Sequence, residues 1–375
     1  MELTRENILN TLGKIVEPDL KNDLVSLNLI EDLEISEEKI TLTVQISNPA
    51  LHARKRMQEA IEFNLKRVFG EKLSLSCVIK GMSTENRSAR RKILPDVKYI
   101  VAIASGKGGV GKSTVTANLA VTLAKMGFKV GILDADIYGP SMPIMFDVES
   151  EKPISVTVDG KSKMKPVESY EIKMLSIGFF TSPSQAVIWR GPMASKALNQ
   201  MIFDADWGEL DFMLLDLPPG TGDIHLSIVQ SLPITGVVVV STPQAVALAD
   251  AKKGVAMFTS DSINVPVLGI IENMAYFTPE ELPENKYYIF GKEGAKNLAE
   301  DLNVSFLGEV PIVQSIREAG DYGRPAALQE GSLIEKVFQE ITRNVVQEVV
   351  KRNENLPATE AVKITTMAGC SAVKK

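Results

Sequence analysis

The amino-acid sequence predicts an α/β protein: a doubly wound, mostly parallel sheet that follows a small N-terminal α+β domain. Three observations support this prediction. Between about residues 98 and 353, apolar runs alternate with helix-like stretches. The runs are continuous in Val, Ile and Leu, which is typical of strands covered on both faces. A glycine-rich stretch at residues 106–114 separates the first run from the first helix-like segment, the order of a phosphate-binding loop.

Length and composition argue against several classes of protein. The 375 residues are enough for two domains that each bury a core. The net charge of −6 argues mildly against a dedicated nucleic-acid binder, and no apolar run approaches the roughly 20 residues of a membrane span. The N-terminus lacks the apolar segment of a signal peptide, and two cysteines cannot build a disulfide framework. We therefore expect a cytoplasmic protein with neither membrane nor nucleic acid as a partner.

Residues 1–80 form the expected α+β domain. Thr4 has the side chain of a helix cap, and the residues after it carry apolar side chains at helical spacing. The remaining expected elements are strands at 24–30 and 39–46, a helix at 50–69 and a strand at 73–79. Cys77 shares the apolar face of the last strand with Leu75 and Ile79, so we interpret it as a core residue.

A basic stretch at residues 81–96 is polar and aperiodic, and it predicts a linker to the main domain at residues 97–355. The expected strands of that domain are 99–104, 130–133, 212–215, 236–240, 267–271 and 306–310, and its expected helices include 115–126, 245–259, 293–302 and 332–352. Residues 356–375 then form a flexible tail that contains Cys370.

The stretch GKGGVGKST carries the most specific chemistry of the chain. It matches the G-x-x-x-x-G-K-[ST] pattern, in which glycines let the backbone aim its N–H groups at a polyphosphate beside a helix N-terminus. Lys112 is expected to reach the β- and γ-phosphates of ATP, and the Ser113 hydroxyl to bind Mg²⁺. The predicted nucleotide-binding residues of the loop are Gly106, Lys107, Gly108, Gly109, Val110, Gly111, Lys112, Ser113 and Thr114.

Two further strand ends supply carboxylates beside this loop. Asp134 and Asp136 follow the second strand, and of the two we expect Asp136 to orient the attacking water. Asp216 ends the third strand in the Walker B pattern and would hold Mg²⁺ directly or through water. The rigid turn at residues 218–220 predicts a switch loop that senses the γ-phosphate. The predicted catalytic residues are Lys107, Lys112, Asp136 and Asp216.

Four other residues carry weaker signals. Asn273 follows a strand end and is expected to bond adenine through its amide, although it also fits a plain turn residue. Pro311 follows the last strand and is expected to wall the other side of the base. His52 and His225 have no partner at metal-ligand spacing, so we interpret both as structural.

The second lysine of the loop, Lys107, makes it resemble the deviant Walker A motif of the MinD/ParA/nitrogenase iron protein class. That resemblance implies an ATP-dependent homodimer in which Lys107 reaches the partner's nucleotide. The stretches LDADIYGPS, DLPPGTGD, IENMAYF, YYIFGKEGAK and VPIVQSIREAGDYGRP, after an N-terminal domain with VEPDL and SNPALHAR that is similar to MIP18 (DUF59), resemble the Mrp/ApbC/NBP35 family. This implies a cytosolic P-loop ATPase that binds an iron–sulfur cluster at its dimer interface. It would act with the assembly machinery and deliver the cluster to apo-proteins.

The chain departs from that family at the cluster ligands. Members usually carry a C-x-x-C pair shortly after the stretch ENM-x-Y-F, so that two chains supply four thiolates, the usual set for a [4Fe–4S] cluster. The corresponding stretch here, residues 278–283, contains no cysteine. Cys370 in the tail is the candidate cluster ligand, with two thiolates per dimer, although an incidental tail cysteine fits equally well.

Three functions stay open from the sequence. The first is an ATP-hydrolysing iron–sulfur cluster carrier that works as a homodimer. The second is a positioning ATPase of the MinD/ParA kind, against which the negative net charge and the absence of a terminal basic amphipathic helix count. The third is an ATP-gated adaptor without its own cluster, which the missing pair of cysteines favours.

Overall fold

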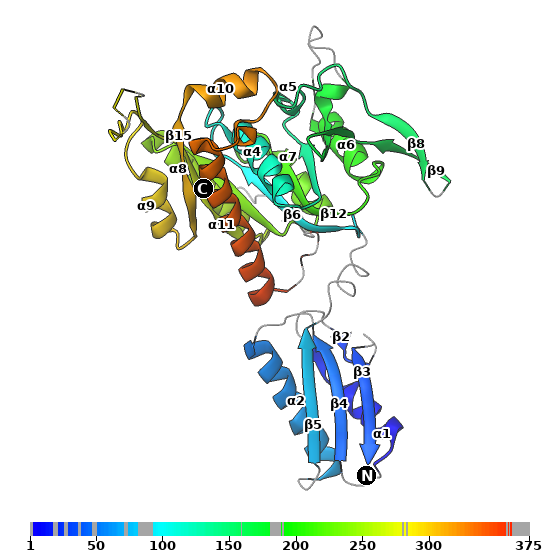
Figure 1. Ribbon diagram of the computed structural model, residues 1–375. Coiled ribbons are helices and arrows are strands. Elements are labelled where there is room, and N and C mark those ends of the chain that lie inside the picture. Colours follow the sequence, from blue (N-terminus) through cyan, green and yellow to red (C-terminus); the bar gives the residue numbers. More distant parts are fainter. Residues whose placement is uncertain are drawn as a thin grey trace, which may run out of the picture. The chain divides into compact units, whose positions relative to one another are not determined.

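The computed structural model describes residues 3–17, 22–25, 29–36, 39–46, 51–70, 74–81, 93–158, 160–180, 189, 191–279, 281, 282, 284–357, 359 and 361. The chain forms two compact units, the smaller built mainly from residues 1–92 and the larger mainly from residues 93–349 (Figure 1). The predicted boundaries at 81–96 and 356–375 fall largely outside the described residues and stay predictions. Among the residues described, no helix is both long and apolar enough to cross a bilayer.

The smaller unit combines two helices with a three-stranded sheet. Its elements are α1 (Arg5–Leu12), β1 (Val16–Glu17), β2 (Asn22–Asp23), β3 (Ile30–Ser36), β4 (Lys39–Ile46), α2 (Leu51–Phe69) and β5 (Ser74–Gly81). The sheet has the order β3-β4-β5, in which β3 is antiparallel and β5 parallel to β4. The Thr4 hydroxyl accepts a hydrogen bond from the Asn7 backbone N–H, which is the helix cap expected from the sequence.

The strand predicted at residues 24–30 is wrong. Leu24 lies in a turn, its carbonyl accepts a hydrogen bond from the Leu29 N–H, and the strand begins only at Ile30. Leu24 and Leu29 are buried, so their apolar character reflects core packing rather than strand pairing. The real strand β3 was missed because it is rich in acidic residues. A register shift between Ile30 and Asp32 also breaks its alternation.

An eight-stranded sheet forms the centre of the larger unit (Figure 1). Its strands are β6 (Val97–Ala104), β7 (Val130–Asp134), β10 (Val167–Ser169), β11 (Ile172–Ser176), β12 (Leu210–Asp216), β13 (Gly236–Ser241), β14 (Val267–Phe277) and β15 (Phe306–Ile312). They lie in the order β10-β11-β7-β12-β6-β13-β14-β15, and every neighbouring pair except β10 and β11 is parallel. The predicted fold class is confirmed, and each strand predicted for this domain lies within an observed strand.

Helices cover both faces of this sheet. The core on one face receives α4 (Lys112–Lys125), α5 (Met142–Met145), α10 (Gln314–Asp321) and α11 (Leu333–Asn355). The core on the other face receives α6 (Gly191–Phe203), α7 (Asp223–Ser231), α8 (Ala245–Thr259) and α9 (Gly294–Asp301). Along β12, Phe212 and Leu214 pack into the first core, whereas Met213 and Leu215 pack into the second. This two-sided burial explains why the strand has no polar alternation.

A two-stranded antiparallel hairpin, β8 (Ile154–Val158) with β9 (Lys161–Lys165), stands beside the main sheet and was not predicted. Its strand residues are mostly exposed or half-buried, so they lack the apolar runs that identify the central strands. The Met164 backbone N–H donates to the Asp204 carbonyl at 2.7 Å, and the Asp206 N–H donates to the Met164 carbonyl at 2.8 Å. These bonds anchor β9 to the segment that follows α6.

Candidate nucleotide-binding site

The glycine-rich loop joins β6 to α4. Gly109 and Gly111 have φ angles of 80° and 81°, a backbone conformation that residues with a Cβ rarely adopt. A Cβ on Gly106 would lie only 2.1 Å from the backbone carbonyl carbon of Asp250 on α8. The loop therefore depends on glycine at these three positions, and it ends where Lys112 opens α4.

Asp216 lies at the centre of a buried polar network beside this loop. The Lys112 Nζ lies 2.8 Å from the Asp216 Oδ1, and the Ser113 hydroxyl donates to the Asp216 Oδ2 at 2.6 Å. Thr116 places its hydroxyl 2.8 Å from the same Oδ1. The Lys112 and Asp216 side chains are 6% and 0% exposed, so this charge pair is removed from solvent. The predicted residues Lys112, Ser113 and Asp216 are thus brought together.

The order of the strands in the sheet brings Asp216 next to the glycine-rich loop. β12 lies beside β6, and Asp216 is paired in register with Ile103, one residue before the end of β6. Because parallel strands share one carboxyl edge, the end of β12 falls next to the loop that leaves β6. The Gly220 N–H donates to the Ser105 carbonyl at 2.9 Å, which ties the predicted switch loop at residues 218–220 to the start of the phosphate-binding loop.

Asp134 and Asp136 have different surroundings. Asp134 is fully buried, and it accepts hydrogen bonds from the Ser176 hydroxyl at 2.8 Å and from the backbone N–H groups of Asp136 and Met142. Burial, with the neighbouring Asp216 charge second, raises the pKa of Asp134 to about 7. Asp136 is 9% exposed and accepts from the Gly139 N–H, and burial also raises its pKa. Asp134 therefore braces the segment after β7, while Asp136 is the more accessible carboxylate.

The residues present fit a nucleotide with Mg²⁺. The Ser113 hydroxyl and the Asp216 carboxylate are hard oxygen donors of the kind that Mg²⁺ prefers, and they lie side by side. Lys112 supplies a buried positive charge at the same place. The N-cap residue of α4 is Gly111, and among the described residues no side chain caps this end. The first N–H groups of the helix are thus left for an anion.

Asn273 holds the loop itself. Its side-chain Nδ2 donates to the Val110 carbonyl at 2.8 Å, and a Cβ on Gly111 would lie 2.2 Å from that nitrogen. A contact between Asn273 and adenine stays a prediction, as does a contact with Pro311. Pro311 does not follow the last strand as expected, because β15 continues through it to Ile312.

The remaining predicted site residues lie apart from this network. Lys107 is exposed, and no ion pair of its ammonium is found within the described part of the chain. Cys370 lies outside the described residues, as does the side chain of His52. His225 is buried on α7 with its ring 6.4 Å from that of Phe258, and burial lowers its pKa, in agreement with a structural role.

Cys77 is a core thiol, as predicted. It is half-buried on β5 and packs against the core of the smaller unit. Burial, with the Glu62 charge second, raises its pKa to about 11, the opposite of what a metal-binding thiolate needs. Among the described residues, no three His, Cys, Asp or Glu side chains gather as a metal site would require.

Sequence reasoning missed two residues of the site. Thr116 lies four residues after Lys112, so a helix beginning at the lysine places both on one face, and this spacing is a usable signal. Ser176 ends β11, a strand that the sequence did not reveal. It reaches Asp134 only because β11 pairs with β7, which places Ser176 opposite Asp134 in register.

The fold and this site together define a P-loop NTPase. A family described as "NUBPL iron-transfer P-loop NTPase" matches residues 96–346, and one described as "Iron-sulfur cluster assembly protein" matches residues 5–73. The chain therefore belongs to the NUBPL iron-transfer P-loop NTPase family, with an iron–sulfur assembly domain before it. The resemblance inferred from the sequence motifs is confirmed.

Curated relatives match most of the chain. An "Iron-sulfur cluster carrier protein" of Synechocystis is 40% identical over 92% of this chain and 98% of its own. The protein of the same name from Escherichia coli K12 is 39% identical over 95% of each. An Arabidopsis thaliana "Iron-sulfur protein required for NADH dehydrogenase, mitochondrial" is 46% identical over 73% of this chain and 84% of its own.

Solved structures resemble the larger unit. A nucleotide-binding protein from Archaeoglobus fulgidus in complex with ADP is 38% identical, with a TM-score of 0.54 over 65% of this chain and 93% of its own. The cell division ATPase MinD of Pyrococcus furiosus is 24% identical, with a TM-score of 0.50 over 66% and 98%, which indicates a shared fold alone.

Proposed function

We propose that this chain binds and hydrolyses ATP with Mg²⁺ and, as a homodimer, carries iron–sulfur clusters to apo-proteins in the cytoplasm. The buried network of Lys112, Ser113 and Asp216 beside the glycine loop is the observation that carries the proposal. The names of the family and of its curated relatives, which refer to iron transfer and to carrying iron–sulfur clusters, support an iron–sulfur cluster as the cargo.

Each residue has a role in the proposed reaction. Ser113 and Asp216 would hold Mg²⁺, which would supply positive charge to the phosphates of ATP when bound. Lys112 adds its own charge there, as the loop N–H groups do. Asp136 orients the attacking water, because it is the accessible carboxylate of its segment. Asp134, held by three hydrogen bonds, fixes the chain that positions Asp136.

The homodimer rests on Lys107. It lies in the loop but is exposed, so its ammonium is available to the nucleotide of a second copy. A charge supplied by the partner would make hydrolysis depend on association, and so couple the nucleotide to the state of the dimer.

The iron–sulfur cluster is the cargo in this proposal, and Cys370 is its candidate ligand. Cys77 is a poor alternative because its thiol is packed against a core and has a raised pKa. A dimer with Cys370 alone offers two thiolates, which leaves ligands for a client to supply. The same shortage favours a second candidate function, in which the chain is an ATP-gated adaptor that recruits clients without a cluster of its own.

Anaerobic reconstitution with iron and sulfide separates these two functions. The native chain and a Cys370→Ala variant are assayed for bound iron, sulfide and visible absorption. A cluster that forms on the native chain and is lost in the variant supports the carrier. If the native chain takes up no cluster, the carrier function is wrong, and the adaptor is the function that fits.

A further inference from the structure

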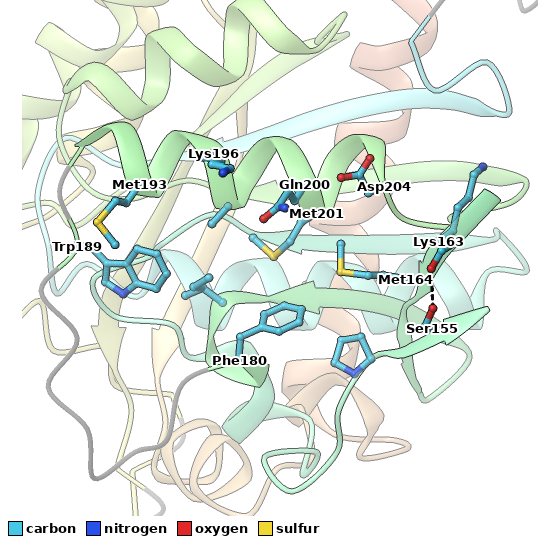
Figure 2. Close-up of a pocket in the computed structure, with 14 residues that line it drawn as sticks. Ser155, Lys163, Met164, Phe180, Trp189, Met193, Lys196, Gln200, Met201 and Asp204 are labelled. Carbon is cyan, nitrogen blue, oxygen red and sulfur yellow. Dashed lines mark hydrogen bonds between the residues drawn. The ribbon is translucent and has the colours of Figure 1, made fainter. Parts of the chain in front are cut away.

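A groove of about 780 Å³ lies between α6 and the β8–β9 hairpin of the larger unit, away from the nucleotide loop. Figure 2 shows α6 on one side of this groove with Met193, Lys196 and Met201, while Met164 and Phe180 approach from the other side. We call it the α6–β9 groove. Its volume is in the range of ligand sites, and the proposed reaction does not use it.

One face of α6 lines the groove. Met193, Ala197 and Met201 are spaced four residues apart, so they fall on one side of the helix. Met201 is 1% exposed and forms the floor, whereas Met193 at 50% and Phe180 at 49% are open to solvent. An apolar surface of this kind, buried at its base and exposed at its rim, is typical of a site for another chain.

The surroundings of the groove are basic. Lys163 and Lys196 line it, and Asp204 is the carboxylate that lines it among the described residues. Lys161 and Lys165 alternate with Met164 along β9, so they lie on the strand face opposite to it and do not line the groove. No ion pair of these four lysines is found in the described part of the chain.

We propose that the α6–β9 groove binds an acidic amphipathic peptide segment of a client protein, with an apolar side chain in the groove and carboxylates beside the lysines. The positive charges of Lys163 and Lys196, which line the groove, favour a partner that carries carboxylates. Methionines adapt their shape, so one groove can accept different apolar anchors. The inference rests on the proposed function in identifying the partner as a client.

The groove is connected to both segments that border the nucleotide. Ile177 in its wall follows Ser176, whose hydroxyl donates to Asp134. Helix α6 also contacts α7, through the hydroxyls of Ser195 and Ser227 at 3.2 Å and through a bond from the Ser231 hydroxyl to the Asn199 side chain at 3.1 Å. Because α7 begins directly after the switch loop, a segment bound in the groove lies one helix away from it.

Tryptophan fluorescence of the full chain tests this proposal without nucleotide or cluster. Trp189 lines the groove, and the other tryptophan, Trp207, is 2% exposed and reports little. The probe is a synthetic helical peptide with Leu and Phe four residues apart among Glu residues. A second peptide has the same anchors among Lys residues. The Glu peptide should shift the emission of Trp189 in a saturable way, with an affinity about tenfold or more above that of the Lys peptide.

Three variants locate the binding. Lys163→Glu combined with Lys196→Glu should weaken the Glu peptide about tenfold or more, and Ala197→Phe should abolish binding by filling the groove. Lys252→Glu, at an exposed lysine of α8, is the matched control and should change nothing. Calorimetry with Trp189→Phe checks that the signal, rather than the binding, depends on that ring.

The outcomes are separate from those of the proposed function. Equal binding of the two peptides, an equal loss in the Lys252→Glu control, or no saturable shift at all would overturn the groove proposal. Each variant is also tested for binding of a fluorescent ATP analogue, which should be unchanged and shows that the chain is folded. Failure of ATP hydrolysis or of cluster uptake would instead contradict the proposed function and leave peptide binding standing.

Discussion

The ammonium of Lys112 lies 2.8 Å from the Asp216 carboxylate, and both side chains are buried. Each group therefore compensates a charge that would otherwise be stranded away from water. Two hydroxyls, from Ser113 and Thr116, complete the shell of Asp216. The pair connects the glycine-rich loop with the end of β12, and it ties the stability of this region to its proposed function.

Removal of Lys112 should destabilise the larger unit. Lys112→Met leaves the Asp216 charge buried without its partner, which costs about 3 kcal/mol of unfolding free energy. Adding Asp216→Asn should recover a large part of that loss, because the stranded charge disappears. Urea unfolding of the two single variants and the double variant measures this as a double-mutant cycle.

Lys98→Met is the control for that cycle. Lys98 lies only 2.6 Å from Asp211, yet its side chain is 54% exposed, so losing the pair should cost less than about 1 kcal/mol. If Lys98→Met lowers the free energy of unfolding as much as Lys112→Met does, burial does not set the energy of these pairs.

Gly106 should tolerate no side chain. A Cβ there meets the backbone of Asp250 and Ala251, which cannot move aside as a flexible side chain would. Gly106→Ala should therefore abolish nucleotide binding and lower the melting temperature. At Gly108 the nearest atom to a new Cβ is 3.8 Å away on Pro219, so Gly108→Ala should keep the fold. Similar melting temperatures for the two variants would contradict the close approach of α8 to the loop.

Ser113 and Thr116 should differ in their dependence on metal. Ser113→Ala removes a proposed Mg²⁺ donor, so ATP affinity should fall in Mg²⁺ but change little when EDTA is present. Thr116→Val removes a hydroxyl that bonds Asp216 and the Lys112 carbonyl but removes no proposed Mg²⁺ donor. Any loss of ATP affinity should therefore be smaller, and of equal size with Mg²⁺ and with EDTA. Calorimetric titration with and without Mg²⁺ measures both. A Ser113→Ala defect of equal size in EDTA would argue against a metal role for this hydroxyl.

Cys77 should react slowly with alkylating agents in the folded chain. With a pKa raised to about 11, its thiolate fraction at pH 8 is roughly two orders of magnitude below that of an ordinary thiol. In a Cys370→Ala chain, the rate with iodoacetamide should rise about tenfold per pH unit between pH 8 and 10. Glu62→Gln should speed the reaction, because the negative charge that disfavours the thiolate is gone. A fast, pH-independent reaction would contradict the burial of this thiol.

Lys107 should matter for association and not for folding. Because it is exposed, Lys107→Ala should leave the melting temperature unchanged. We expect this variant to lose ATP-dependent dimerisation and most of its hydrolysis, with ATP binding retained. Sedimentation of the native chain and the variant, with and without ATP, tests this. A variant that still dimerises with ATP would exclude a role across the interface.

The central sheet was predictable because its strands are buried on both faces. Burial of that kind leaves continuous apolar runs, as in β12 and β13, and six of the eight strands were found, whereas β10 and β11 at one side of the sheet were missed. Elements without such burial were not found. Strand β3 is acidic and bulged, and β8 and β9 lie outside the main sheet with mostly exposed residues. These strands pair with their neighbours in sequence, but they lack the continuous apolar runs that mark a buried strand.

The site divides in the same way. Lys112, Ser113 and Asp216 belong to local motifs and were predicted, and the structure brings them together. Ser176 reaches Asp134 only through the pairing of β11 with β7, so no motif marks it. Asn273 was expected to follow a strand end, but it lies within β14 (Val267–Phe277), and its bond to the Val110 carbonyl depends on the fold of the whole domain.

The most direct test of the central claim is ATP turnover by the native chain in Mg²⁺, beside Lys112→Ala and the control Lys125→Ala. Lys125 is at the other end of α4, where it pairs with Glu335, so its loss should leave turnover unchanged. Turnover that is lost in Lys112→Ala and in EDTA is the predicted result. Turnover that survives the loss of Lys112, or its absence from the native chain at every protein concentration, would contradict the account.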